Sequence, residues 1–206
     1  AVDRAGLVGS DGETHQGVFD LSFLSSIPNL SILSPKNRWE MADMVRFAVS
    51  FQYPVALRYP RGEAYEGLKE FRAPIEYGKS ELLYEESEIA VMFVGHMSFL
   101  AEQVREDLKA AGYQCSLINA RFVKPLDTNH RILVTIEENV LTGGFGEQVE
   151  DFVMREDIPL KVRTIGISDD YVEHGNVDVL RKEVGLDRES IVKKVIADDQ
   201  RIEEEK

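Results

Sequence analysis

The sequence is poor in cysteine, in long apolar runs and in positive charge, and each shortage argues against a class of protein. Cys115 is the only cysteine, so the chain has no internal disulfide, and we expect a protein of the reducing cytoplasm. No stretch approaches the roughly 20 apolar residues that span a bilayer, and Ala1–Arg4 has no apolar signal-peptide core, so we expect no membrane partner. With 24 Lys and Arg against 37 Asp and Glu the net charge is −13, which argues against nucleic acid as a partner.

Short apolar runs alternate with amphipathic segments along the chain. Between residues 29 and 59, two apolar runs flank a segment in which Met41, Met44, Val45 and Ala48 share one helical face, and Ser34 and Pro35 would begin that helix. A strand–helix–strand unit of this kind connects parallel strands. The pattern predicts an α/β fold of mainly parallel sheets with helices on both faces. The expected strands are 30–33, 54–59, 89–94, 114–119, 132–137 and 161–165, and the later expected helices are 98–111, 147–155, 176–184 and 188–199.

A change in composition divides the chain into two units. Glycine and proline become frequent among charged residues after Gly62, which is typical of a linker. We therefore expect a first unit over residues 1–65, a linker over 66–80 and a second unit over 81–206. A β-hairpin arm that crosses between the units is the alternative for the linker.

The segment Arg4–Gly17 is the first candidate for a functional loop. It holds four glycines, which allow sharp turns and close approach of the backbone to a ligand, together with Arg4, Asp11 and His15. Loops that follow strands carry the sites of α/β proteins. The alternative is a surface turn with a solvated His15.

A second candidate follows the strand that ends the first unit. Arg58–Gly62 contains two arginines, Arg58 and Arg61, at a strand end that can lie beside the first loop. Arginine suits the bidentate recognition of phosphate or carboxylate. A surface arginine pair is the alternative.

These segments resemble the 1-deoxy-D-xylulose-5-phosphate synthase family of transketolase-like thiamine diphosphate enzymes. The resemblance covers nearly the whole chain and corresponds to the C-terminal portion of such enzymes. Transketolases and 2-oxo-acid dehydrogenase β subunits share the general plan, but the first loop combined with Arg58–Gly62 favours the synthase family. The stretches that carry the resemblance are Arg4–Gly9, Asp11–Gly12, Thr14–Asp20, Arg58–Gly62, Arg121–Asp127, Glu137–Asn139, Gly143–Gly146 and Glu173–Gly175.

The resemblance implies an organisation, a reaction and roles for four residues. The first unit would be the C-terminal half of a pyrimidine-binding domain, and the second a complete transketolase C-terminal domain. The complete enzyme, expected to be a homodimer, would condense pyruvate with glyceraldehyde 3-phosphate with loss of CO₂, the first step of a route to isoprenoids that also supplies thiamine synthesis. Residues matching Arg4 and Arg61 face the acceptor's phosphate in that family, and those matching Asp11 and His15 face the substrate-derived part of the thiamine adduct. Guanidinium groups suit a phosphate, and a histidine with a carboxylate suits proton handling.

Two departures from the family limit this expectation. The family's catalytic glutamate, the aromatic residues beside the aminopyrimidine and the diphosphate and Mg²⁺ site match no part of this chain, and there is no initiating Met. We therefore expect an upstream region or a second chain to supply thiamine diphosphate and Mg²⁺ binding, no cofactor or metal ligands here, and no activity of the chain alone. Lys124–His130 also runs almost directly into the strand at Ile132, where the family places a helix. Whether this is a true deletion stays open.

Other interpretations of the sequence stay open. The chain could belong to another transketolase-group enzyme, such as a dehydrogenase β subunit, or be a non-catalytic C-terminal interaction module. Gly143–Gly146 could hold an anion at a helix start, although tight packing is the commoner role of such glycines. His96 could line a pocket or be structural.

Overall fold

The computed structural model describes residues 1–10, 12–86, 89–124 and 132–204. Its larger part is a five-stranded sheet in which four strands run parallel and the edge strand β3 is antiparallel. Ile89 of β4 lies opposite Cys115 of β5 on one side and Ile132 of β7 on the other. The strands in spatial order are β3 (Glu81–Tyr84), β5 (Cys115–Asn119), β4 (Ile89–Phe93), β7 (Ile132–Val140) and β8 (Lys161–Ile167).

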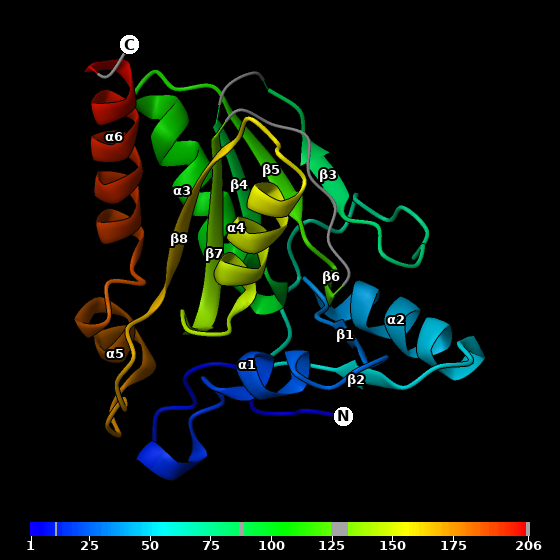
Figure 1. Cartoon of the computed structure of the whole chain (residues 1–206). Helices are drawn as coiled ribbons and strands as arrows, with labels where there is room; N and C mark the ends of the chain where they lie inside the picture. The colour runs from blue at the N-terminus through cyan, green and yellow to red at the C-terminus, as the bar shows by residue number, and fades with distance from the viewer. Residues whose placement is uncertain (11, 87–88, 125–131, 205–206) are drawn as a thin grey trace.

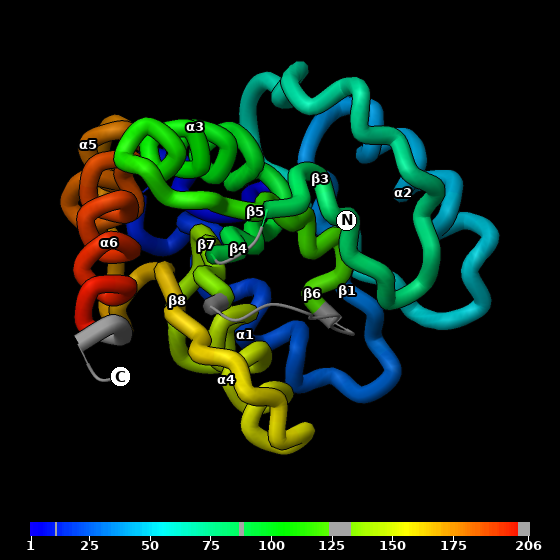
Figure 2. The backbone as a smooth tube through the Cα atoms, turned by 90° about the horizontal axis from the view of Figure 1, so that it is seen from above, coloured from blue at the N-terminus to red at the C-terminus, as the bar shows by residue number. Residues whose placement is uncertain are grey.

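Helices cover both faces of this sheet (Figures 1 and 2). On one face, α3 (Ser98–Ala110) buries Ala101, Val104 and Leu108 and packs against α6 (Arg188–Glu204). Gly112 ends α3 with φ +93°, a conformation that favours glycine. The other face carries two further helices, and a short one follows β8. These are α1 (Asp20–Ser25) and α4 (Phe145–Arg155) on the second face, and α5 (Val177–Glu183) after β8.

A second, three-stranded sheet contains strands from both units of the sequence. β1 (Ser31–Leu33) lies between β2 (Val55–Leu57), which is parallel to it, and β6 (Phe122–Lys124), which is antiparallel. The helix α2 (Arg38–Ser50) connects β1 and β2, as the sequence predicts. Because β6 follows the large sheet's strand β5 in the chain, the two parts of the molecule share this small sheet.

Buried charges fill the junction between the two sheets. Lys36 Nζ lies 2.9 Å from Glu40 Oε1 and 2.5 Å from Glu81 Oε2. Arg121 pairs with the same two carboxylates, at 2.9 Å and 2.8 Å, and Asn119 Nδ2 donates to Glu40. The four charged side chains are between 1% and 5% exposed. The two cations and the two carboxylates thus neutralise one another away from water. We call Lys36, Glu40, Glu81, Asn119 and Arg121 the junction network.

The predicted α/β fold is confirmed, with local corrections. The helix after β1 begins at Arg38, later than Ser34 and Pro35 suggest, because the Asn37 side chain caps it by accepting the N–H of Glu40 at 3.0 Å. The sequence patterns did not predict α1, β3 or β6. Residues 66–80 form no helix or strand, yet Leu68 is buried and Arg121 donates to two of their carbonyls.

Two expectations concern the remaining parts of the chain. Of the helices in the described ranges, none is long and apolar enough to cross a membrane. The stretch that departs from the family pattern after Lys124 lies outside the described residues as far as residue 131, so the question of a deletion there stays open.

Candidate functional site

The two predicted loops start from neighbouring backbone segments. Tyr59 N donates to Val2 O at 2.9 Å, and Ala5 N donates to Tyr59 O at 3.1 Å. Arg4 and Arg61 therefore leave adjacent extended segments, and both are exposed. The structure brings these two segments together, as their places at strand ends predict.

The first loop is closed at its base by glycine. Gly6 and Gly17 exchange two backbone hydrogen bonds of 2.8 Å, and a Cβ on Gly17 would lie 1.7 Å from Arg4 O. The loop can therefore close only if this position is glycine. His15 ends a 3₁₀ turn, η1 (Glu13–His15), where it is exposed and its Nδ1 lies 2.9 Å from Thr14 Oγ1. Asp11 lies outside the described residues.

A buried glutamine anchors the far side of this loop. Gln16 Oε1 accepts the N–H of Val8 at 2.7 Å, and Gln16 Nε2 donates to Glu173 O at 3.1 Å. The Glu173–Gly175 stretch, which belongs to the resemblance, therefore contacts the first loop. No local pattern indicates this contact, because the two partners are 157 residues apart.

The two arginines of Arg58–Gly62 have different environments. Arg58 is fully buried, and its Nε donates to Asp20 Oδ1 at 2.8 Å. Its Nη2 donates to Gly17 O at 3.0 Å and to Glu138 O at 3.1 Å. Arg58 thus ties the base of the first loop to β7, whereas Arg61 lies at the surface.

Glu138 is the centre of a second cluster, which sequence reasoning did not identify as a site. Its Oε2 accepts the N–H of Leu7 at 3.0 Å and lies 2.8 Å from His96 Nε2, and its Oε1 accepts Arg181 Nε at 2.7 Å. Burial by itself would raise the pKa of Glu138, but the hydrogen bonds and charges of His96 and Arg181 outweigh it and hold that pKa at about 2. An ionised carboxylate only accepts, so Nε2 of His96 carries the hydrogen.

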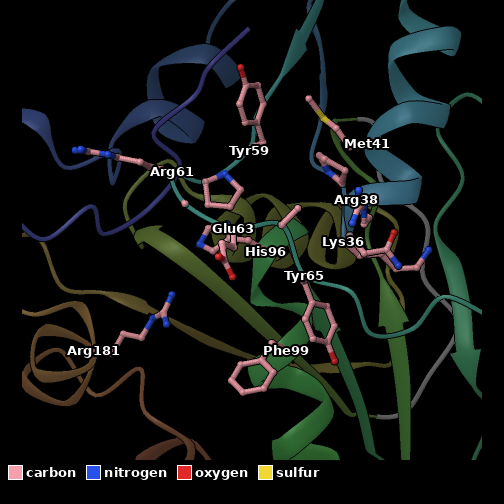
Figure 3. A pocket seen from close by; sticks show the side chains of 15 residues that line it. Lys36, Arg38, Met41, Tyr59, Arg61, Glu63, Tyr65, His96, Phe99 and Arg181 are labelled. Carbon is pink, nitrogen blue, oxygen red and sulfur yellow. The ribbon is translucent and has the colours of Figure 1, made fainter.

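His96 both has a structural partner and lines a cavity. The cavity, of about 480 Å³, lies between the chain segments on either side of α2 and the start of α3 (Figure 3). Arg61 is part of its wall, with His96 and Arg181 from the second unit. Arg4 and His15 are not in the wall, so the four predicted site residues do not all gather at this cavity.

The glycine-rich segment before α4 already has a carboxyl group from within the chain at its N–H groups. Glu137 accepts the N–H groups of Phe145 and Gly146 at 2.8 Å and 2.7 Å, at the start of the helix. A Cβ on Gly146 would lie 2.5 Å from Thr164, so tight packing also requires glycine there. Burial raises the pKa of Glu137 to about 7, although the two backbone donors favour its charged form and lower it.

The raised pKa of Glu137 predicts a change of stability with pH. The folded protein binds this proton more readily than the unfolded chain, so the free energy of unfolding falls as pH rises from about 4.5 to about 7. Because one pKa unit corresponds to about 1.4 kcal/mol, we expect a loss on the order of 3 kcal/mol. Glu137→Gln, followed by urea unfolding from about pH 4.5 to 8, should flatten this decline.

Glu156→Gln is the matched control, because Glu156 is exposed just after the same helix. If the decline between about pH 5 and 7 persists in Glu137→Gln as it does in the control, Glu137 does not carry the raised pKa.

The described residues show no cluster of side chains that would ligate the metal of a thiamine enzyme. Among them, no group of three or more His, Cys, Asp or Glu could hold a metal ion. The helix start that follows Gly143 and Gly144 is occupied by Glu137. We assign no step through thiamine diphosphate or Mg²⁺ to these residues.

Comparisons with known families match both parts of the chain. The family described as transketolase, C-terminal domain, matches residues 78–191, and that described as transketolase, pyrimidine binding domain, matches residues 1–66. Among solved structures, a split gene transketolase described as an inactive beta4 tetramer aligns with a TM-score of 0.84 at 24% identity, over 95% of this chain and 64% of that one. A transketolase from Campylobacter jejuni aligns with a TM-score of 0.73 at 18% identity, over 95% of this chain and 30% of that one.

Curated relatives carry a more specific name. The 1-deoxy-D-xylulose-5-phosphate synthase of Lachnoclostridium phytofermentans is 47% identical over 95% of this chain and 33% of its own length. The synthase of Aquifex aeolicus is 41% identical over 95% of this chain and 32% of its own length. The chain thus spans about a third of the length of these relatives. It belongs to the transketolase family, and it matches the C-terminal portion of 1-deoxy-D-xylulose-5-phosphate synthases.

Proposed function

We propose that this chain is the C-terminal portion of a 1-deoxy-D-xylulose-5-phosphate synthase. The complete enzyme would join pyruvate to glyceraldehyde 3-phosphate, releasing CO₂ and forming 1-deoxy-D-xylulose 5-phosphate. The observation that carries the proposal is 47% identity to such a synthase over 95% of the chain. Thiamine diphosphate, bound with Mg²⁺ by the rest of the enzyme, would supply the means to decarboxylate pyruvate. The complete enzyme would be a homodimer and would act in the cytoplasm.

In this proposal the chain's own residues bind the acceptor and handle protons. Arg4 and Arg61, which leave adjacent backbone segments, would donate to the phosphate of glyceraldehyde 3-phosphate. His15, exposed at the end of η1, and Asp11 would exchange protons with the reacting carbonyl and hydroxyl oxygens. Arg58 and Gly17 would act indirectly, by fixing the loop from which these side chains project.

We propose further that the chain is inactive by itself and requires the upstream part of the enzyme, on the same or a separate polypeptide. The direct test is a joined enzyme, in which the part of the L. phytofermentans synthase that precedes its matched segment is fused to Ala1. We expect this joined enzyme to form 1-deoxy-D-xylulose 5-phosphate, and the chain alone to form none. A joined enzyme that folds and binds thiamine diphosphate but uses another acceptor would instead support a different transketolase-group enzyme.

Arg61→Ala in the joined enzyme should weaken the use of glyceraldehyde 3-phosphate selectively. A charge-assisted hydrogen bond is worth roughly 1.5–3 kcal/mol, so we expect about a ten- to hundred-fold rise in the KM for this substrate. The KM for pyruvate, which carries no phosphate, should change little. Steady-state kinetics with each substrate varied in turn measures both values.

Arg46→Ala provides the control, because Arg46 is an exposed arginine of α2 whose ion pair is with the nearby Asp43. Equal rises in both KM values for Arg61→Ala would remove the dedicated phosphate role.

A further inference from the structure

The cavity beside His96 has the size and lining of a ligand site. Its volume of about 480 Å³ lies within the range that encloses a small organic molecule. Segments 35–41 and 59–65 of the first unit line it, together with His96, Phe99 and Arg181 of the second unit. Figure 3 shows Tyr65 and Phe99 together at one end, while Arg181 reaches from α5 toward His96.

Cationic side chains outnumber carboxylates among the residues of this wall. The charged residues in the wall are Lys36, Arg38, Arg61 and Arg181 against the single carboxylate of Glu63. The Lys36 ammonium is already neutralised by the junction network. Arg38 pairs with Glu66 and Arg181 with Glu138, so the capacity of this wall to bind an anion depends on the guanidinium donors that these pairs leave unused.

Arg181 is held in a position that leaves donors unused. Its Nε donates to Glu138 Oε1 at 2.7 Å, and its terminal nitrogens make no hydrogen bond within the described ranges. The side chain is 28% exposed. A guanidinium that is fixed through Nε keeps the N–H donors of its two terminal nitrogens for a planar or tetrahedral anion.

His96, a residue of the same wall, has a buried polar atom without a hydrogen-bond partner among the described residues. Its side chain is 10% exposed, its Nε2 is held by Glu138, and its Nδ1 is buried with no hydrogen-bond partner in the part of the chain that the structure describes. A buried polar atom without a partner is costly, and a protonated ligand oxygen would satisfy it. Glu138 thus orients both Arg181 and His96.

We propose that this cavity binds the phosphate ester of a small organic molecule. Arg181 donates its terminal N–H groups to the phosphate, His96 Nδ1 accepts a hydroxyl hydrogen of the phosphate or of the organic part, and the uncharged part of the ligand lies against Tyr65 and Phe99. The inference goes beyond the proposed reaction, since Arg181 and His96 contact the phosphate ester here in place of Arg4 and Arg61, and the site needs no thiamine diphosphate. The same Glu138 carboxylate accepts the N–H of Leu7, so a ligand in the cavity would also affect the position of the first loop.

Calorimetric titration of the chain with inorganic phosphate and with glycerol 3-phosphate tests the proposal. We expect both to bind, glycerol 3-phosphate more tightly, and glycerol not to bind. The chain has four histidines, so the NMR ring resonance of His96 can be identified by its absence from the spectrum of a His96→Gln variant. In the unmodified chain this resonance should shift on addition of phosphate. Arg181→Gln should weaken binding about tenfold or more, as expected for the loss of a charge-assisted contact.

Lys182→Gln is the matched control, because it removes one positive charge from an exposed position of the same helix, outside the cavity wall. Arg181→Lys keeps a charge beside Glu138 without the fork and should also bind less tightly, which keeps the test usable if Arg181→Gln does not fold. Binding that Arg181→Gln weakens no more than Lys182→Gln would overturn the proposal. So would binding that depends on Arg61 alone, or a His96 resonance that phosphate leaves unmoved.

Discussion

Glu40→Ala is expected to lower the free energy of unfolding by roughly 3–5 kcal/mol, the usual result of removing one partner from a buried ion pair. Glu40 accepts hydrogen bonds from Lys36, Arg121 and Asn119, all within the junction network. Without it, two buried cations share the single carboxylate of Glu81. Its Oε2 also accepts the backbone N–H of Lys36, just before α2, so the start of the helix loses a cap as well.

Chemical denaturation of Glu40→Ala and of Glu66→Ala measures this effect against a matched surface pair. Glu66 pairs with Arg38, and their side chains are 64% and 56% exposed, so its loss should cost no more than about 1 kcal/mol. Glu40→Gln should fall between the two variants, because the amide can still accept hydrogen bonds while its charge is lost. Comparable costs for Glu40→Ala and Glu66→Ala would show that the junction network does not stabilise the fold.

His15→Ala in the joined enzyme is expected to lower turnover by about 10²-fold or more, the scale of a positioned acid–base group. His15 is exposed at the end of η1, on a loop fixed at its base by Gly6, Gly17 and Arg58. An imidazole in that position can accept a proton from one oxygen and donate a proton to another. The affinity for thiamine diphosphate should stay almost unchanged, because we expect the residues that bind this cofactor to lie in the upstream part of the enzyme.

His174→Ala serves as the control for this variant, since His174 is also an exposed loop histidine. Single-turnover and steady-state assays of both variants, with cofactor titrations, separate a catalytic role from a binding role. If His15→Ala kept turnover within about twofold of the unmodified joined enzyme, the loop histidine would be solvated and without catalytic work.

The layers of the fold could be predicted because they depend on local patterns. The spacing of Ala101, Val104 and Leu108 and the glycine that follows are enough to place α3 and its buried face. β6 and β3 were missed because each is short and antiparallel, and their apolar runs, residues 122–123 and 82–84, span only two and three residues. α1 was missed because its six residues have no side-chain cap.

The candidate site was only partly predictable for a different reason. That Arg4 and Arg61 start from neighbouring segments follows from the positions of the two strand ends. Sequence patterns cannot tell which arginine of Arg58–Gly62 is buried, because that depends on Asp20 and on carbonyls far along the chain. The Glu138 cluster likewise joins residues 42 and 43 positions away, with no local signal.

The pairing of β6 with β1 constrains the order in which the protein can fold during its synthesis. β1 is complete at Leu33, but its antiparallel neighbour ends at Lys124, after β3, β4, α3 and β5. A nascent chain therefore carries β1 with one open edge while most of the large sheet is still being made. Unpaired strand edges favour association with other chains, so we expect this polypeptide to be most prone to association between the synthesis of Leu33 and that of Lys124.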